Sequence, residues 1–268
     1  MDVYEQAAGI LAATKRAVCF SGSGISQESG IPTFRDPGGL WDQFDPEEFG
    51  TAQGIMGVFQ RQPDVIRNFL LNTVEIFEKA KPNPTHFAVA ELERLGIVTT
   101  VITQNVDNLH TDAGSVNVLE VHGNLFRARC LRCGRRYPLA KGPWLVKTWE
   151  ILEDKEHFGI PSVLKIMPGC ECGGMTRPDV VMFGESVQQL NPSFRAAMGC
   201  EAMLVLGTSG VVYPAGEVPH RAKQAGAKVI EVNATENCYS IITDVFIKEP
   251  SGQAMPKVME HVKKLLGK

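Results

Sequence analysis

Two closely spaced cysteine pairs supply four possible metal ligands. Cys130 and Cys133 form a Cys-x-x-Cys pair, and after 36 intervening residues Cys170 and Cys172 form a Cys-x-Cys pair. Thiolates at such spacings, followed by glycines that permit tight turns, can bind one tetrahedral zinc ion. Because four cysteine ligands leave no open coordination position, the predicted zinc is structural rather than catalytic. The alternative is four unrelated buried cysteines.

A glycine-rich turn follows the apolar residues 17–20 and is the strongest nucleotide-binding signal in the chain. Glycines let a backbone approach a ligand closely, and the N–H groups of such a turn suit a pyrophosphate. Most dinucleotide-binding turns run straight into a helix. This segment instead continues to Pro32 and Arg35, a rigid residue and a fixed cation, which predicts a nucleotide site with reactive groups of its own.

Polar residues follow a second apolar run. Gln104, Asn105 and Asp107 offer amide and carboxylate groups that can bind a ribose and a carboxamide. The alternative is a turn in which Asn and Asp side chains bind their own backbone. His122, beside Gly123, is a candidate general base near neutral pH. His110 competes for this role because it shares the polar segment, and spacing alone does not separate the two.

Apolar runs alternating with amphipathic stretches position these groups. Strands are expected at residues 17–20, 97–103, 203–209, 228–233 and 245–247, and helices at 4–15, 84–95 and 214–225. This alternation predicts an α/β fold with a Rossmann-type, doubly wound parallel sheet. Ligands bind outside the carboxyl ends of such strands, which is where the unusual residues cluster.

Two regions interrupt the alternation and predict the domain organisation. Residues 1–35, 81–125 and 179–268 are expected to form the Rossmann-type domain. Residues 36–80 are expected to form a helical insert, and residues 126–178 a small zinc-binding module.

Composition limits the function classes. The chain has 268 residues, 44% hydrophobic content and a formal net charge of −3, so nothing favours direct binding of nucleic acid. No apolar run reaches the length of a membrane span, and the first residues do not resemble a secretion signal. An odd number of cysteines, with four in tight pairs, fits a reducing compartment, so a cytoplasmic location is expected. The oligomeric state is left open.

Taken together, these motifs resemble the sirtuin family of NAD-dependent protein deacylases over roughly residues 10–260. The resemblance is carried by residues 22–35 (GSGISQESGIPTFR), 103–110 (TQNVDNLH), His122-Gly123, the two cysteine pairs, 177–185 (RPDVVMFGE), Gly207-Thr208-Ser209 and Asn233. Ser23 departs from the pattern, since the family usually has alanine there.

The resemblance implies that NAD is a co-substrate and zinc a structural metal. It also implies that the Rossmann-type domain binds NAD and that the insert of residues 36–80 lines the acyl and cofactor cleft. It implies His122 as general base, with Asn105 and Asp107 also catalytic. The residues implied to bind NAD are Gly22, Ser23, Gly24, Ser26, Glu28, Thr33, Phe34, Arg35, Gln104, Asn105, Asp107, Gly207, Thr208, Ser209 and Asn233. The residues implied to pair with an acyl-lysine peptide as an added strand are Val181, Phe183, Gly184 and Glu185.

The implied reaction removes an acyl group, most simply acetyl, from a lysine side chain. NAD is consumed, and nicotinamide and O-acyl-ADP-ribose are released. Two alternatives are kept: a protein mono-ADP-ribosyltransferase that uses the same NAD cleavage, and a non-catalytic NAD-sensing module. Family members that remove succinyl groups carry a Tyr and an Arg where this chain aligns Phe69 and Asn72. An apolar pocket without a fixed cation favours acetyl or longer fatty acyl groups, although Arg67 lies close in sequence.

Overall fold

The computed structural model describes residues 2–34 and 37–268, which form two compact units. The first unit contains Met1–Thr33, Lys81–His122 and Val187–Lys268, and the second contains Phe34–Ala80 and Gly123–Ser186. Among the described residues, every helix is too short or too polar to span a lipid bilayer.

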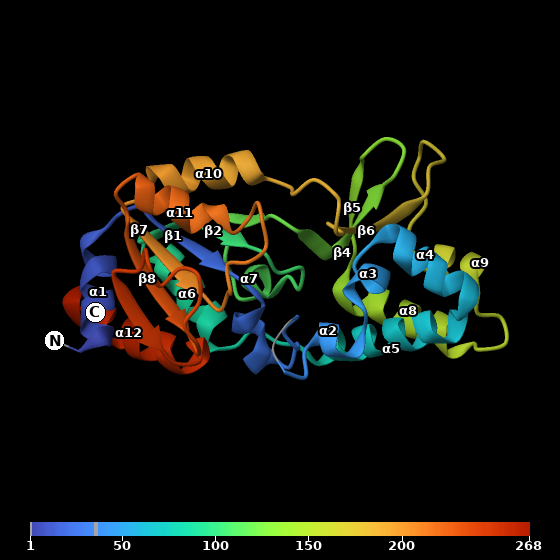
Figure 1. Cartoon of the computed structure of the whole chain (residues 1–268), viewed down its shortest axis with the longest axis horizontal. Helices are drawn as coiled ribbons and strands as arrows, with labels where there is room; N and C mark the ends of the chain where they lie inside the picture. Colours follow the sequence, from blue (N-terminus) through green and yellow to red (C-terminus); the bar gives the residue numbers. More distant parts are fainter. Residues whose placement is uncertain (1, 35–36) are drawn as a thin grey trace. The chain divides into compact units, whose positions relative to one another are not determined.

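The first unit is built on a six-stranded parallel sheet with the strand order β3-β2-β1-β7-β8-β9 (Figure 1). Its elements are α1 (Val3–Ala13), β1 (Ala17–Ser21), the 3-10 helix η1 (Ser23–Ser29), α6 (Pro84–Arg94), β2 (Val98–Thr103), α7 (Leu109–Asp112), β3 (Val118–Glu120), α10 (Leu190–Gly199), β7 (Ala202–Leu206), α11 (Glu217–Gln224), β8 (Lys228–Asn233), β9 (Val245–Lys248) and α12 (Ser251–Leu265). The strand order reverses at β1, as in a Rossmann fold. The predicted fold class is confirmed.

Both faces of this sheet are covered, which explains the continuous apolar runs of its strands. Alternate residues of β1 enter different cores: Cys19 packs with α1, α6 and α12, whereas Val18 and Phe20 pack with α10 and α11. Figure 1 shows α10 and α11 on one side of the sheet and α1 and α12 on the other. Strands buried on both faces are apolar at most positions, and this made them visible in the sequence.

The segment after β1 differs from its prediction. Ser23–Ser29 form η1 directly after Gly22, so the turn does run into a helix, although a short one of 3-10 type. Asn83, the residue before α6, fixes this helix from the side. Its Nδ2 donates to the carbonyl of Ile25 at 2.6 Å and to Oγ of Ser29 at 2.9 Å. The start of α6 therefore positions the glycine turn.

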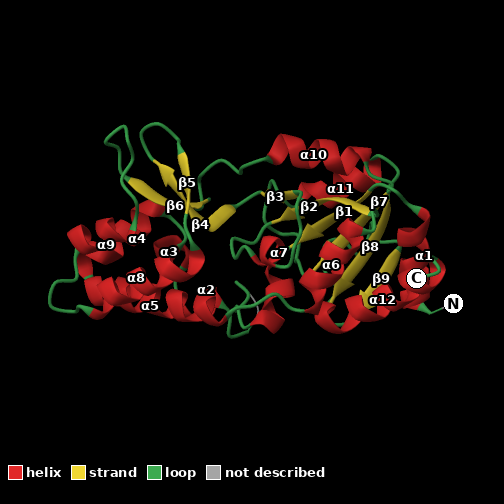
Figure 2. Ribbon diagram, turned by 180° about the vertical axis from the view of Figure 1, so that it is seen from behind, coloured by secondary structure: helices red, strands yellow, loops and turns green. Residues whose placement is uncertain are grey.

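The second unit combines helices with a three-stranded antiparallel sheet of order β5-β4-β6 (Figure 2). Its elements are α2 (Leu40–Gln43), α3 (Pro46–Phe49), α4 (Ala52–Arg61), α5 (Pro63–Lys79), β4 (Gly123–Cys130), β5 (Arg136–Pro138), α8 (Lys141–Glu153), α9 (Ile160–Ile166) and β6 (Thr176–Val180). One apolar cluster joins α5 to α8 and α9, and a second joins α2, α3, α4 and α5.

The helices of this unit therefore come from two separate stretches of the chain that share cores. Arg67 on α5 illustrates the connection, because its guanidinium donates to the carbonyls of Leu152 and Glu153 at the end of α8. Carbonyl groups at a helix C-terminus lack partners within the helix, and a guanidinium can satisfy them. Arg67 thus ties α5 to α8.

Candidate active site and zinc centre

The carboxyl ends of the central strands lie in register along one edge of the first unit's sheet. Ser21 at the end of β1 is paired with Thr103 of β2 on one side and with Leu206 of β7 on the other. Leu206 is in turn paired with Val232 of β8. The glycine turn, the polar segment after β2 and the turn after β7 therefore leave the sheet at the same level, beside the point where the strand order reverses.

The turns after β1 and β7 touch through their backbones. The N–H of Gly24 donates to the carbonyl of Gly207 at 2.8 Å. A Cβ on Gly24 would lie 2.8 Å from that oxygen, and Gly207 has a φ of 53°. Glycine is needed at both positions because there is no space for a side chain at the first and the backbone of the second is left-handed.

A chain of hydrogen bonds links the glycine turn to the polar segment. The Nδ2 of Asn105 donates to the carbonyl of Gly22 at 3.1 Å and to Oγ of Ser26 at 3.0 Å. The Ser26 hydroxyl donates to Oδ2 of Asp107 at 2.6 Å, and Oδ1 of Asp107 accepts from the N–H of Leu109. Because both amide hydrogens of Asn105 are used, its Oδ1 is the group that it can offer to a ribose hydroxyl.

A second set of bonds connects the polar segment to the turn after β7. Gln104 Nε2 donates to Oγ1 of Thr208 at 2.8 Å. The carbonyl of Thr208 accepts from Asn233 at 3.0 Å and from Asn237 at 2.9 Å. Asn237 was not identified from the sequence. Asn233 therefore shapes the turn, whatever else it binds.

His122 is held in one tautomer. Its Nδ1 lies 3.1 Å from the carbonyl oxygen of Gln104, and since a carbonyl only accepts, Nδ1 carries the hydrogen. The lone pair of the neutral ring is then on Nε2, the atom that can take up a proton. Burial lowers the pKa of His122 from 6.5, so the neutral, basic form predominates near pH 7.

The structure separates His110 from His122. His110 is 2% exposed and its Nε2 lies 2.9 Å from Oγ of Ser21, which itself donates to Thr103. Burial lowers the pKa of His110 to about 3 and that of the adjacent His86 to about 4. His110 is therefore a neutral buried residue that supports the strand ends, and the link to Ser21 was not foreseen.

The remaining predicted site residues fall in different places. Glu28 accepts from the N–H of Gly252 at 2.7 Å, at the start of α12, and Thr33 is buried. Ser23 begins η1 and Ser209 follows Thr208 in the turn after β7. Arg35 lies outside the described residues.

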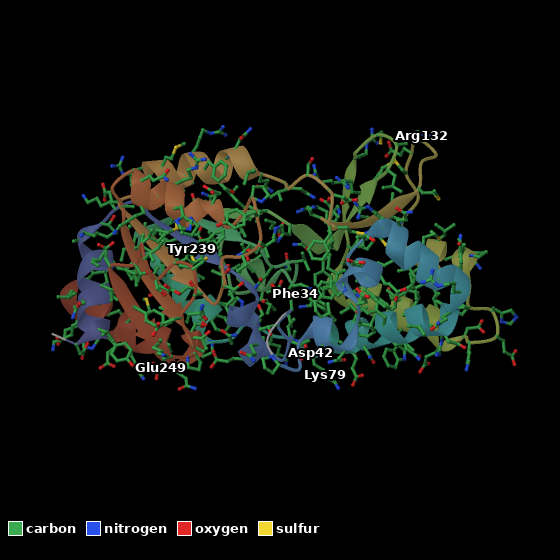
Figure 3. The ribbon with its side chains drawn as sticks, in the orientation of Figure 1. Phe34, Asp42, Lys79, Arg132, Tyr239 and Glu249 are labelled. Atoms are coloured by element: carbon green, nitrogen blue, oxygen red, sulfur yellow. The ribbon has the colours of Figure 1, made fainter. Side chains whose placement is uncertain are left out.

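The residues expected to bind a peptide belong to the second unit. Phe183 donates its N–H to the carbonyl of Gly50 at 2.8 Å, and its ring lies 5.9 Å from that of Trp41. Trp41 in turn lies 5.5 Å from Phe34, which is labelled in Figure 3. The segment 181–185, which includes Val181 and Gly184, therefore follows β6 directly and is anchored by an aromatic contact.

The four cysteines of the second unit converge. Their sulfur atoms all lie within 4.8 Å of one another, with 3.6 Å between Cys130 and Cys172 and 3.6 Å between Cys133 and Cys170. Zn–S bonds of about 2.3 Å in a tetrahedron give S–S separations of about 3.8 Å, so this donor set fits zinc. Tyr137 lies with its hydroxyl 3.1 Å from the sulfur of Cys170. Four sulfur ligands make the zinc centre structural.

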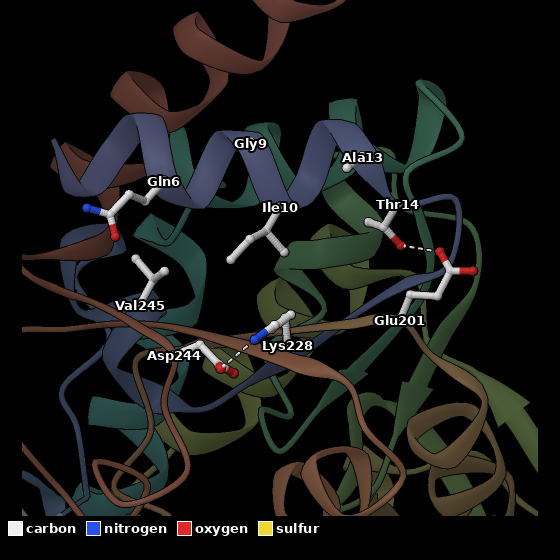
Figure 4. Close-up of a pocket in the computed structure, with 9 residues that line it drawn as sticks. All are labelled: Gln6, Gly9, Ile10, Ala13, Thr14, Glu201, Lys228, Asp244 and Val245. Atoms are coloured by element: carbon white, nitrogen blue, oxygen red, sulfur yellow. Dashed lines mark hydrogen bonds and ion pairs between the residues drawn. The ribbon is translucent and has the colours of Figure 1, made fainter. Parts of the chain in front are cut away.

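A separate pocket of about 670 Å³ lies along α1 in the first unit and is lined by none of the predicted site residues (Figure 4). Its charged groups are already used. Glu201 accepts from Thr14 at 2.7 Å, and Asp244 pairs with Lys228 at 3.1 Å and with Lys223 at 2.6 Å. The charged side chains of this pocket are therefore already paired with neighbouring residues.

Comparisons with known proteins agree on the family. The model of the Sir2 family matches residues 22–214. An NAD-dependent protein deacylase of Desulfosudis oleivorans is 46% identical over 265 residues, covering 98% of this chain and 97% of its own length. NAD-dependent protein deacylase 2 of Archaeoglobus fulgidus is 45% identical and covers 98% of each chain.

Solved structures show the same relationship. A Sir2 homologue in complex with NAD has a TM-score of 0.79 and 36% identity, covering 99% of this chain and 95% of its own. Sir2Af2 bound to a myristoylated histone peptide has a TM-score of 0.73 and 38% identity, covering 99% and 98%. A mutant Sir2 homologue in complex with 2′-O-acetyl ADP ribose has a TM-score of 0.80 and 35% identity, covering 100% and 99%. With these matches over nearly its whole length, this chain belongs to the Sir2 family.

Proposed function

We propose that this chain is an NAD-dependent protein-lysine deacylase in which His122 is the general base. The observation that carries the proposal is the pairing of Nδ1 of His122 with the Gln104 carbonyl, which leaves Nε2 as a basic atom at a strand-end nucleotide site. Relatives with 40–46% identity are named NAD-dependent protein deacylases, which supports the same activity here.

NAD fits the first unit because the polar groups there match its parts. The close backbone approach of Gly24 and Gly207 leaves a turn without side chains, as a pyrophosphate requires. Asp107 can bind the nicotinamide carboxamide and the Oδ1 of Asn105 a ribose hydroxyl. When bound, NAD supplies a ribose carbon that exchanges nicotinamide for the acyl oxygen of an acyl-lysine.

The role of each residue follows from its geometry. His122 Nε2 accepts the proton of a ribose hydroxyl, and that hydroxyl is then able to attack the acyl carbon. Gln104 orients His122 through its carbonyl while its side chain is fixed by Thr208. One water molecule is consumed as the bond between the acyl carbon and the lysine nitrogen breaks, and the products are free lysine, nicotinamide and O-acyl-ADP-ribose. All the cofactor contacts named in the sequence analysis stay predictions, including those of Glu28, Thr33, Phe34, Arg35, Ser209 and Asn233.

The peptide-binding role of Val181, Phe183, Gly184 and Glu185 also stays a prediction, supported by their place after β6. Solved Sir2 proteins bound to a myristoylated histone peptide and to a deacetylated p53 peptide support acyl-lysine peptides as substrates. The division into an NAD-binding domain, a helical insert and a zinc module, the cytoplasmic location and the lack of direct nucleic-acid binding are proposed on the sequence alone.

The acyl group is proposed to be neutral. Phe69 packs its ring 4.9 Å from Phe44 and 5.0 Å from Phe49, in an aromatic cluster. Asn72 is exposed, and the guanidinium of Arg67 is engaged by α8. No cation on this stretch of α5 is thus available to a carboxylate, so acetyl and fatty acyl groups are favoured over succinyl.

A labelled-NAD experiment separates deacylation from protein ADP-ribosylation. The chain is incubated with NAD radiolabelled in its adenosine half and an acetyl-lysine peptide, and the products are resolved. Label in a small O-acetyl-ADP-ribose product supports the proposal. Label retained on protein would favour the transferase, and the absence of peptide-dependent NAD cleavage would favour the sensing module.

A further inference from the structure

One face of the three-stranded sheet carries a row of arginines. Arg136 of β5, Arg129 of β4 and Arg177 of β6 are directly opposite one another. Arg127 lies two residues before Arg129 and therefore on the same face of β4. We call these four residues the arginine face. Like charges at opposed positions of a sheet are destabilising unless something neutralises them.

Two carboxylates contribute to that neutralisation. Asp179, whose side chain is 0% exposed, accepts from Nε of Arg127 at 2.8 Å and from Nε of Arg136 at 2.7 Å. Glu185 pairs with Arg177 at 2.5 Å. Asp179 and Glu185 thus each lie close to more than one guanidinium group of the arginine face.

Arg129, at the centre of the row, has the weakest partners. Its Nε lies 3.5 Å from Asp179 and its Nη2 lies 3.8 Å from Glu185, beyond the usual length of a charged hydrogen bond. No shorter bond from this guanidinium is made to any residue that the structure describes, and its side chain is 29% exposed. Arg129 therefore has no close carboxylate partner among the described residues, and part of its guanidinium is accessible.

The surrounding sequence has the same charge bias. Residues 123–138 and 170–186 contain six arginines and three acidic residues, whereas the whole chain has a net charge of −3. Arg132, labelled in Figure 3, lies in the turn after β4. The small sheet is thus a positively charged part of an acidic protein.

The arginine face adjoins the segment proposed to pair with a peptide. Arg177 donates to the carbonyl of Val180 at 3.0 Å and holds Glu185, so it spans the base of residues 181–185. A peptide strand advances about 3.3 Å per residue, so a side chain a few positions from the acyl-lysine comes within reach of these guanidinium groups.

We propose that the arginine face binds acidic side chains of the protein substrate, so that acyl-lysines with Asp or Glu two to five positions away are preferred. This inference rests on the proposed deacylase function and adds the substrate class. Arginine suits the task because its planar fork binds carboxylates in a bidentate way. Because Arg177 contacts Val180 and Glu185 next to the proposed peptide-binding segment, we infer that the ligand of the arginine face is an acidic protein segment and not a nucleic acid.

The test compares acetyl-lysine peptides of equal length whose flanking residues are Glu, Gln or Lys. The ratio of kcat/KM for the Glu peptide to that for the Gln peptide is measured at low and high salt. Exposed charge pairs contribute modestly, so a ratio of about fivefold is expected at low salt, decreasing towards one at high salt. The Lys peptide should be the poorest substrate.

Variants assign the effect to the face. Arg129→Gln and Arg136→Gln should each lower the ratio, whereas Arg136→Lys, which keeps the charge, should retain most of it. Arg136 is the more exposed of the two, so its variants keep the test available if Arg129→Gln does not fold. Arg94→Gln, which removes an exposed arginine paired with Glu91 on α6, is the matched control and should leave the ratio unchanged.

Binding of fluorescently labelled Glu and Gln peptides is measured in parallel by anisotropy. A preference for the acidic peptide can then be detected even if turnover is absent. Loss of turnover for every peptide would contradict the deacylase function, whereas equal binding of the Glu and Gln peptides would overturn the arginine-face proposal. A ratio that persists in both glutamine variants would also overturn it. Inhibition by a short DNA duplex without any preference for acidic peptides would identify the face as a nucleic-acid surface instead.

Discussion

The hydroxyl of Ser26 donates a 2.6 Å hydrogen bond to Oδ2 of Asp107, and this bond joins the turn after β1 to the segment after β2. Ser26 is 1% exposed and Asp107 is 5% exposed. The distance is that of a charge-assisted hydrogen bond, the stronger class. The two most distinctive motifs of the sequence are thus one physical unit.

Breaking this bond should weaken NAD binding. Ser26→Ala leaves the buried carboxylate with one partner fewer, at a cost of about 1–3 kcal/mol, so the KM for NAD should rise about fivefold or more. Asp107→Asn should have an effect at least as large, because it also alters the group proposed to bind the carboxamide. The measurement is initial rate against NAD concentration. Asp64→Asn, an exposed position on α5, is the control, and equal KM values for all variants would contradict the link.

Removal of the general base should abolish most turnover. His122→Ala is expected to lower kcat by about 100-fold or more, since positioned acid–base groups contribute that much. His157→Ala, at an exposed histidine paired with Asp154, should keep full activity. Melting temperature and zinc content are measured for both, because only a folded, zinc-loaded His122→Ala protein tests the assignment. Unchanged kcat in such a protein would transfer the role to another residue.

The pH dependence of kcat should report the same histidine. Burial lowers the pKa of His122 below 6.5, so the basic form persists to slightly acidic pH. Activity should therefore be retained at pH 6.5 and fall as the pH drops further. A kcat that falls already between pH 8 and pH 7 would contradict a buried neutral imidazole as the base.

Stability should also decrease in acid because of two other histidines. The pKa is lowered to about 4 in His86 and to about 3 in His110, both by burial. Below pH 6.5 the unfolded chain binds protons at these sites and the folded chain does not. Each histidine then removes up to about 1.4 kcal/mol of unfolding free energy per pH unit down to its folded pKa. Urea unfolding at pH 7, 6 and 5 measures this. Replacement of His110 by Gln should flatten the slope, and an unchanged slope would exclude its contribution.

Zinc should be required for the second unit to fold. Binding by four thiolates contributes on the order of 10 kcal/mol in small zinc modules, so Cys133→Ser should lose the metal and lower the melting temperature. The prediction is one zinc per chain by elemental analysis. Cys238→Ser, at an exposed cysteine outside the ligand set, should keep both zinc and stability. Full zinc content in Cys133→Ser would show that the four sulfurs do not form the centre.

The strands of the parallel sheet could be predicted from the sequence, whereas those of the small antiparallel sheet could not. The parallel strands were visible because residues such as Val18, Cys19 and Phe20 face two cores at once. The strands β4, β5 and β6 were not, because their exposed face carries charged side chains such as Arg129 and Arg177, which interrupt any apolar run. The helix α12 was not predicted either. Its contact with Glu28, which accepts a hydrogen bond from the N–H of Gly252, joins distant segments and is not visible in the sequence.

The site was predictable in its residue types but not in its connections. Motif spacing placed Asn105 and Asp107 correctly after a strand. Their hydrogen bonds to Ser26 could not be predicted, because these bonds join segments that are 79 to 81 residues apart in the sequence. Spacing also did not distinguish His122 from His110. The extent of burial distinguishes them, because His110 is 2% exposed whereas His122 is only partly buried. Burial of His110 is set by α6 and the neighbouring strands rather than by the local sequence.

Product stoichiometry tests the central claim most directly. The chain is incubated with NAD and an acetyl-lysine peptide, and nicotinamide, deacetylated peptide and O-acetyl-ADP-ribose are quantified by mass spectrometry. We expect nicotinamide, deacetylated peptide and O-acetyl-ADP-ribose to appear in equal amounts, and no nicotinamide to form without the peptide. Deacetylated peptide with free acetate and intact NAD, or nicotinamide released while the peptide stays acetylated, would contradict this expectation.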